Sequence, residues 1–166
     1  IMIVYVTHPE TKETIEIEVG NMDVEALQEL YKTSTPEKKL FSAIENLSLP
    51  AEAKALLLKL KDFSIQVGGV ALEIGKKILE LIIYFVKKYP STIIGLIIGS
   101  VIGMLVSSIP IIGWALGWLL MPLCTALGLA IGFWKDFKDE NLKQAISESI
   151  DQLFSDLREV PTPAQP

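Results

Sequence analysis

The chain has 166 residues, of which 50% are hydrophobic, yet its formal net charge is -5. This length is enough for one domain with a sizeable core. The acidic balance, with no aromatic residues interleaved among basic ones, argues against a nucleic-acid-binding surface. The charged residues are segregated, because residues 89–134 contain none. The chain therefore combines polar ends with a long uncharged middle.

The first region, residues 1–63, begins with a predicted β-hairpin. MIVYV at residues 2–6 and TIEIEV at residues 14–19 are rich in β-branched residues, and the second alternates strictly between apolar and polar. THPETKE separates the two segments and supplies the turn. We expect no further strands to follow.

Short helices are predicted after this hairpin. Asn21 or Asp23 can cap the first helix, and Thr35 with Pro36 can begin the second. A third helix is expected over residues 51–63. We expect the region to be cytoplasmic, and it is a candidate binding surface for a protein partner.

Residues 64–88 are predicted to form one long amphipathic helix. Its charged residues recur at spacings of three and four, so they form a single stripe on an otherwise apolar helix. Such a helix either lies in a membrane interface or is sandwiched in a core. At a membrane, the stripe would be a candidate pore lining or interface. It consists of Glu73, Lys76, Lys77, Glu80, Lys87 and Lys88.

The uncharged residues 89–134 are predicted to form a transmembrane helical hairpin. The segments 91–108 and 110–134 are each long enough to cross a bilayer core of about 30 Å. One continuous helix would be about twice the membrane thickness, so the chain must turn at SSIPIIG. The predicted hairpin tip is Ser107, Ser108 and Pro110.

Lysines flank the hairpin on both sides. By the positive-inside rule they place the protein in the inner (cytoplasmic) membrane with both termini cytoplasmic. Trp114, Trp118 and Trp134 are positioned like interfacial anchors, although tryptophan in a soluble core is nearly as common. A soluble bundle with a buried hairpin is the alternative. The flanking lysines are Lys76, Lys77, Lys87, Lys88, Lys135, Lys138 and Lys143.

Glycines recur at intervals of four residues along both arms of the hairpin. In lipid this spacing lets helix backbones approach closely. It predicts helix packing and a homo-oligomer. The predicted helix-packing residues are Gly95, Gly99, Gly103, Gly113, Gly117, Gly128 and Gly132.

Residues 135–160 are predicted to form a C-terminal amphipathic helix, followed by a flexible tail at residues 161–166. Asp139 can cap the helix, and Leu142, Ile146 and Ile150 recur on one face. That face covers a soluble core, or packs on a membrane or a sister subunit.

The sequence shows no constellation of catalytic or metal-ligating residues. His8 is the one histidine, so no His-based triad or metal cluster can be built. The glycines before Lys76 do not fit a phosphate-binding Walker loop, because Lys77 stands where Ser or Thr is needed. We therefore expect no enzyme activity, no catalytic residue, no metal and no cofactor.

Amphipathic helices, an uncharged hairpin with a very short tip, and IGFWKDFKDENLKQAI at residues 131–146 together resemble the end of a colicin-type pore-forming domain. The resemblance covers roughly residues 64–150. It implies a hairpin that is buried in a soluble helical bundle and inserts into a target membrane. An N-terminal β-hairpin and fewer amphipathic helices set this chain apart from that family.

The sequence therefore predicts a mainly α membrane protein whose partner is the lipid bilayer. We expect it to insert and to form or contribute to an oligomeric pore for ion transport, as a toxin or defence effector. The alternative is a membrane anchor or scaffold whose residues 1–63 bind a partner protein.

Overall fold

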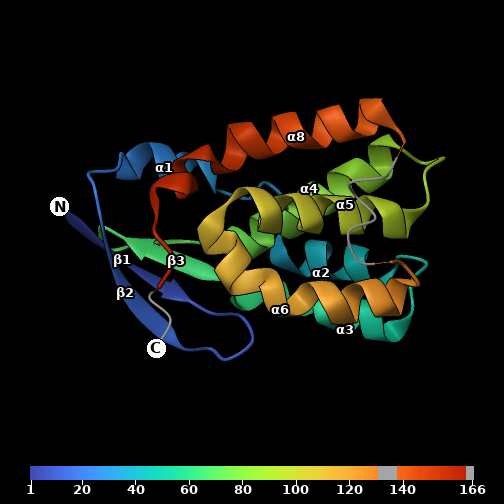
Figure 1. Cartoon of the computed structure of the whole chain (residues 1–166), viewed down its shortest axis with the longest axis horizontal. Helices are drawn as coiled ribbons and strands as arrows, with labels where there is room; N and C mark the ends of the chain where they lie inside the picture. Colours follow the sequence, from blue (N-terminus) through green and yellow to red (C-terminus); the bar gives the residue numbers. More distant parts are fainter. Residues whose placement is uncertain (131–137, 164–166) are drawn as a thin grey trace.

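The computed structural model describes residues 1–130 and 138–163. In this part of the chain a four-stranded antiparallel sheet packs against seven α-helices and two 3₁₀ turns. The sheet lies at one end of the molecule, and the helices extend away from it (Figure 1). The fold is α/β, so the predicted mainly α membrane fold is wrong.

The described part of the chain contains strands, α-helices and two 3₁₀ helices. In chain order they are β1 (Met2–Thr7), β2 (Thr14–Val19), α1 (Val24–Leu30), α2 (Glu37–Glu45), α3 (Ala51–Leu58), η1 (Lys59–Asp62), β3 (Ser64–Val67), β4 (Val70–Leu72), α4 (Ile74–Lys88), α5 (Ile94–Ser108), α6 (Pro110–Leu127), α8 (Glu140–Phe154) and η2 (Ser155–Glu159). The predicted β-hairpin, the short helices after it and the C-terminal helix are confirmed.

Aspartate caps begin two of these helices as the sequence predicts. The Asp23 carboxylate accepts a hydrogen bond from the Ala26 amide at 3.1 Å, and that of Asp139 accepts one from the Leu142 amide at 3.1 Å. Each satisfies a backbone N–H group that has no partner inside its helix. α2 differs from the prediction, because Pro36 rather than Thr35 occupies its N-cap position.

The helix predicted over residues 64–88 is wrong for residues 64–72, which form β3 and β4. Gly68 and Gly69 join these strands with φ of 58° and 78°, the left-handed conformation that two-residue hairpin turns need. Ile65 and Val67 are buried while Gln66 is exposed, which is the two-residue period of a strand. Only the later part of the predicted helix is helical.

β3 pairs with β1, and the sheet order is β2-β1-β3-β4. Helices α1, α2 and α3, followed by η1, form the long connection from the edge strand β2 to the central strand β3. The sheet therefore includes strands from both sides of residue 63. The predicted boundary between residues 1–63 and the following segment falls inside one structural unit.

One face of the sheet packs against the helices and the other face is open. Val4 lies opposite Ile17 and Val67, and all three are buried. The next residue, Tyr5, lies opposite Glu16 on the open face, where both are exposed. This alternation sets the register, because a slip by one residue would bury glutamates in the core.

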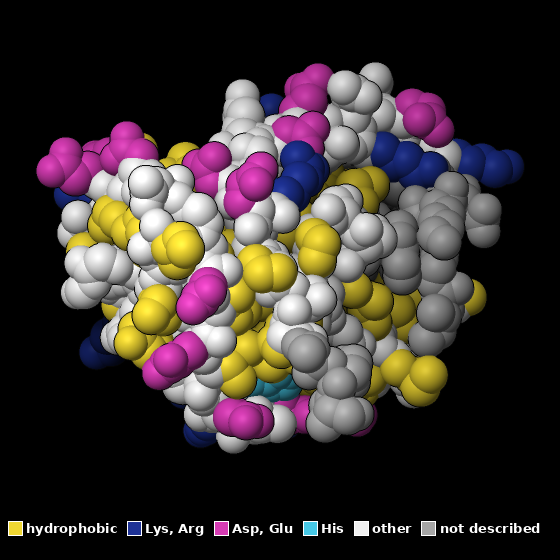
Figure 2. Space-filling model, turned by 60° about the vertical axis from the view of Figure 1, so that its left-hand side comes forward, with side chains coloured by type: hydrophobic (Ala, Val, Ile, Leu, Met, Phe, Trp, Pro, Cys, Tyr) yellow, Lys and Arg dark blue, Asp and Glu magenta, His cyan; other side chains and the backbone are white. Residues whose placement is uncertain are grey.

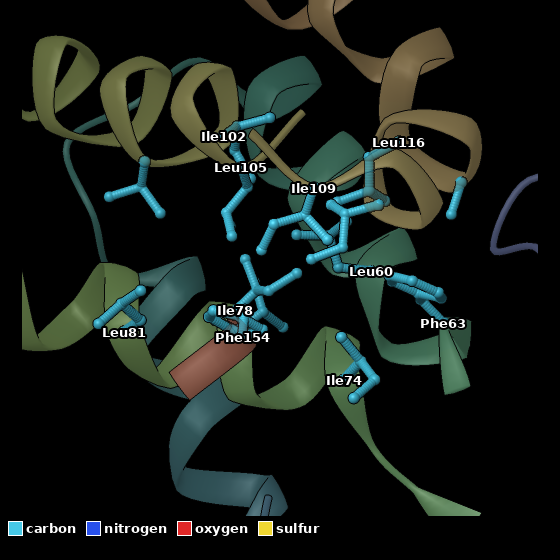
Figure 3. Close-up of a cluster of buried hydrophobic side chains, with 14 of the residues drawn as sticks. Leu60, Phe63, Ile74, Ile78, Leu81, Ile102, Leu105, Ile109, Leu116 and Phe154 are labelled. Carbon is cyan, nitrogen blue, oxygen red and sulfur yellow. The ribbon is translucent and has the colours of Figure 1, made fainter. Parts of the chain in front are cut away.

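The main core lies between the inner face of the sheet and the helices, with α5 at its centre. α5 is buried along most of its length, and Val101 and Ile102 are wholly inaccessible to solvent. Figure 3 shows buried side chains of other elements beside those of α5, among them Leu60 of η1, Ile78 of α4, Leu116 of α6 and Phe154 of α8. A helix predicted to face lipid is thus the central helix of a protein core.

Of the described helices, one is long and apolar enough to cross a membrane, and it is α6. α5 has 15 residues, about 22 Å of helix, whereas a bilayer core is about 30 Å thick. The two helices meet at Ile109, so the predicted turn is confirmed. In this folded form α5 is a short buried helix, so the prediction of two membrane-spanning arms is wrong for the fold that the structure describes.

Candidate functional site

The uncharged pair of helices α5 and α6 is the first candidate site. At its tip Ser107, Ser108 and Pro110 are exposed, while Ile109 between them is buried. The Ser107 hydroxyl donates a hydrogen bond to the Gly103 carbonyl at 2.8 Å. Pro110 is the first residue of α6, where its missing N–H removes no helical hydrogen bond. The polar tip thus ends one helix and begins the next.

Two of the predicted helix-packing glycines lie where α5 and α6 touch. A Cβ atom on Gly113 would lie 2.7 Å from the Val106 carbonyl oxygen. A Cβ atom on Gly95 would lie 3.6 Å from the Leu127 side chain, an ordinary contact. Gly113 is therefore required for the close approach of the two backbones beside the tip.

The other predicted glycines have different surroundings. Gly99 and Gly103 are buried on α5, whereas Gly117 is exposed on α6 with nothing within 4 Å of an added Cβ atom. Gly128 ends α6 with φ of 72°, which is a typical glycine C-cap. Gly132 lies outside the described residues.

The outward side of α6 is exposed and uncharged. A surface helix of a water-soluble fold normally carries charged residues on this side. α6 carries none along its 18 residues, although only 39% of them are buried. Met121 is the most exposed large side chain of the helix, at 65%. The exposed residues on this side are Gly117, Met121 and Thr125, and Trp114 and Trp118 beside them are half-buried.

Trp114 and Trp118 are half-buried and contact the turn between β1 and β2. The His8 imidazole packs edge-to-face on the Trp114 ring, with centroids 5.0 Å apart, and lies 6.5 Å from the Trp118 ring. Its Nδ1 accepts hydrogen bonds from the Glu10 and Thr11 amides at 3.1 and 3.3 Å. Figure 2 shows the imidazole, in cyan, set among hydrophobic side chains.

The contact between His8 and the tryptophans could not be found from the sequence. A lone histidine before a proline carries no pattern, and more than a hundred residues separate it from α6. The third predicted anchor, Trp134, lies outside the described residues.

The first half of the predicted stripe on α4 ties this helix to the start of α2. Lys76 Nζ lies 2.9 Å from the Glu73 carboxylate and 3.3 Å from that of Glu37. Lys77 Nζ lies 3.1 Å from the Glu80 carboxylate and 3.4 Å from the Lys32 carbonyl oxygen. These four charged groups of the stripe therefore connect α4 to the start of α2 and to the segment after α1.

Glu80 is the most constrained of these groups. Its Oε2 atom accepts hydrogen bonds from the Ser34 and Thr35 amides, both at 3.1 Å. Burial by itself would raise the pKa of Glu80, but the hydrogen bonds from Lys77 and Thr35 outweigh it and hold this pKa below its usual value. The carboxylate therefore stays charged with its acceptor positions occupied.

The second half of the stripe is exposed at the end of α4. Lys87 and Lys88 occupy the last turn, where positive charge complements the helix dipole. Lys88 Nζ lies 3.1 Å from the Tyr84 hydroxyl. Lys87 instead lines a groove of about 510 Å³ between α4 and α8. The structure thus divides the stripe into an ion-paired part, which connects α4 to neighbouring segments, and an exposed cationic end.

No family model, curated protein or solved structure matches the chain. Within residues 1–130 and 138–163, no group of three or more histidine, cysteine, aspartate or glutamate residues is placed to hold a metal ion. The absence of enzyme activity and of a cofactor stays a prediction. The function has to be inferred from the hairpin, the stripe and the surfaces around them.

Proposed function

We propose that this chain is a membrane-inserting protein whose α5–α6 hairpin enters a lipid bilayer and contributes to an oligomeric pore. The proposal rests on one observation above all, the uncharged and exposed side of α6. Exposing an uncharged, largely apolar surface to water is unfavourable. A bilayer core accepts apolar side chains and excludes charged ones. The flanking lysines keep both ends of the hairpin, and with them both termini, on the cytoplasmic side.

Insertion starts from the folded α/β form. In this form α5 is held in the core by residues of α4, α6 and α8, so the hairpin must leave the core before it enters lipid. The colicin-type resemblance supports such a step, because it implies a hairpin that is buried first and inserts later. Uncharged residues 91–93 can lengthen α5 in lipid.

The outward side of α6 also supports association between copies. Gly117 is exposed and an added Cβ atom there meets nothing within 4 Å, whereas Gly113 already lies against Val106 of α5. An exposed small residue lets a second helix pack closely in lipid, where close approach supplies the attraction. A pore of several copies would use these faces.

A second candidate function is a membrane scaffold whose sheet binds a partner protein. Ile3 and Tyr5 favour it, because they are 45% and 39% exposed on the open face of the sheet. Apolar and aromatic side chains on an exposed face are typical of protein interfaces. In this case the hairpin anchors the protein without permeabilising the membrane.

Release of a trapped dye from lipid vesicles, measured after adding the purified protein, tests the pore. We expect release, together with flotation of the protein with the vesicles. Flotation without release would favour the scaffold. Recovery of all the protein free of vesicles would refute both functions.

Two matched variants test the role of α6. Met121→Lys adds a charge at an exposed position, so the folded form tolerates it, but a lysine near the centre of a membrane helix costs about 2.5–3.5 kcal/mol. Release should fall about 100-fold. Ile3→Lys makes the same kind of change on the open sheet face and should leave release unchanged. Equal release from both variants would show that α6 does not enter the bilayer.

A further inference from the structure

Two adjoining grooves run along α4. One, of about 510 Å³, lies between α4 and α8, and the other, of about 340 Å³, lies between α4 and α2. They share the lining residues Thr35, Leu40, Ile83 and Lys87. Each volume falls in the range of about 300–1,000 Å³ that is usual for small-molecule sites. We call the combined depression the α4 groove.

Part of the α4 groove is aliphatic. Leu40 and Leu81 line it as buried residues, and Ile83 and Leu153 line it as partly buried ones. They come from α2, α4 and α8, so the tertiary structure brings them together. A hydrocarbon chain lying on these side chains would remove apolar surface from water.

The charged groups that line the α4 groove leave it cationic. Lys39 and Lys87 line it and are exposed. Among the described lining residues Glu80 is the single carboxylate, and it already binds Lys77 and two backbone amides. With Lys77 paired to Glu80, Lys39 and Lys87 leave the described lining of the groove with a net positive charge. The α4 groove is therefore a local site for an anion, although the whole chain has a net charge of -5.

We propose that the α4 groove binds one anionic phospholipid. The phosphate lies between Lys39 and Lys87, whose ammonium groups donate charge-assisted hydrogen bonds to it. An acyl chain lies on Leu81, Ile83 and Leu153. An amphiphile fits better than a free anion or a plain hydrocarbon, because the cationic and aliphatic parts adjoin in one depression.

This site does not depend on insertion of the hairpin. The groove is formed by α2, α4, α8 and the segment before α2, and no residue of α5 or α6 lines it. A short-chain lipid below its micelle concentration offers no bilayer. Binding of such a lipid and release of dye from vesicles are therefore independent results.

Isothermal titration calorimetry of the full chain with dioctanoyl phosphatidic acid, below its micelle concentration, tests the site. We expect saturable binding of one molecule per chain, and at least about tenfold weaker binding of dioctanoyl phosphatidylcholine, whose headgroup is zwitterionic. Shortening the acyl chains should weaken binding about fourfold for each buried CH₂ that is lost. Inorganic phosphate that binds as tightly as the lipid would overturn the proposal.

Neighbouring lysines on the same two helices provide a matched control. The double variant Lys39→Glu with Lys87→Glu changes the lining residues and should lower affinity for dioctanoyl phosphatidic acid at least about tenfold. The double variant Lys38→Glu with Lys88→Glu makes the same change of charge at exposed residues that do not line the groove. It should bind within about twofold of the original chain.

Circular dichroism of both double variants shows whether each is folded, and both substitutions of each pair are at exposed positions. An equal loss of affinity in the two variants would overturn the proposal, because it would mean attraction to net charge rather than to this groove. Unchanged affinity in the Lys39→Glu, Lys87→Glu variant would overturn it as well.

Discussion

Gly75, in the first turn of α4, lies directly against the carbonyl group of Leu60 in η1. A Cβ atom on Gly75 would be 1.5 Å from the Leu60 oxygen and 2.6 Å from its carbon. The Gly75 amide also donates a hydrogen bond to the Phe63 carbonyl at 3.0 Å. The chain leaves η1, forms the β3–β4 hairpin and then begins α4 beside η1 again. Only glycine is small enough for this close approach of the two backbone segments.

Gly75→Ala is expected to lower the free energy of unfolding by about 3 kcal/mol or more, because two backbone segments would have to move apart. Urea denaturation followed by circular dichroism measures this. Gly117→Ala is the control, since an added Cβ atom there meets nothing within 4 Å. It should raise the free energy of unfolding by about 0.5–1 kcal/mol. Similar changes in the free energy of unfolding in both variants would contradict a close contact between Gly75 and the Leu60 carbonyl group.

Ser100→Ala is expected to stabilise the fold. Ser100 is wholly buried on α5, and its hydroxyl has no hydrogen-bond partner among the described residues. An unsatisfied buried hydroxyl costs about 1–3 kcal/mol. Its removal should raise the melting temperature by about 2–4 °C for each kcal/mol that is recovered, which calorimetry can measure. A lower melting temperature would mean that the hydroxyl makes a stabilising contact.

Glu80→Gln is expected to weaken the dependence of stability on acid pH. Despite burial, the hydrogen bonds from Lys77 and Thr35 make the pKa of Glu80 lower in the folded chain than in the unfolded chain. The charged carboxylate of Glu80 therefore stabilises the fold fully above its pKa in the unfolded chain. This stabilisation is lost as the pH falls through its pKa in the folded chain. Urea midpoints measured from pH 7 to pH 3 should fall less steeply for the variant. Parallel curves would exclude this role for Glu80.

Tyr31→Phe is expected to loosen the junction of α1 with α8. The buried Tyr31 hydroxyl donates a hydrogen bond to the Leu153 carbonyl, and its ring lies 5.8 Å from that of Phe154. Burial, followed by the charge of Asp156, raises the pKa of Tyr31 well above its usual value, so it remains a donor.

The lost bond should lower the free energy of unfolding by about 1–2 kcal/mol, measured by urea denaturation. Tyr84→Phe serves as the control, because Tyr84 is 50% exposed on α4. Its effect should stay within about 0.5 kcal/mol. A loss of the same size in both variants would assign the effect to the hydroxyl in general and not to the buried bond.

The features that were predicted correctly from the sequence depend on residues close together in the chain. Asp23 and Asp139 cap helices through amides three residues later. The β1–β2 hairpin follows from two alternating segments and one turn, and the bend at Ile109 follows from Ser107, Ser108 and Pro110 around it. Such interactions are available to any chain that has these residues in this order.

The segment at residues 64–72 shows where local reasoning failed. The helix predicted over residues 64–88 begins before the charged stripe and crosses a glycine pair, Gly68 and Gly69, that in fact forms a turn. The strand character of β3 depends on its pairing with β1, about sixty residues earlier. β3 has four residues, and the alternation in so short a segment cannot indicate which distant strand it pairs with.

That α5 and α6 are apolar helices joined by a tight turn follows from the order of residues alone, because hydropathy and helix-breaking residues act locally. The burial of α5 in a protein core, and the place of Lys39 and Lys87 along one groove, depend on the packing of distant segments. Hydropathy measures the transfer of a side chain out of water, and this is equally favourable whether the side chain then meets lipid or other side chains. The surroundings of α5 are supplied by α4, α6 and α8, whose packing depends on the whole chain.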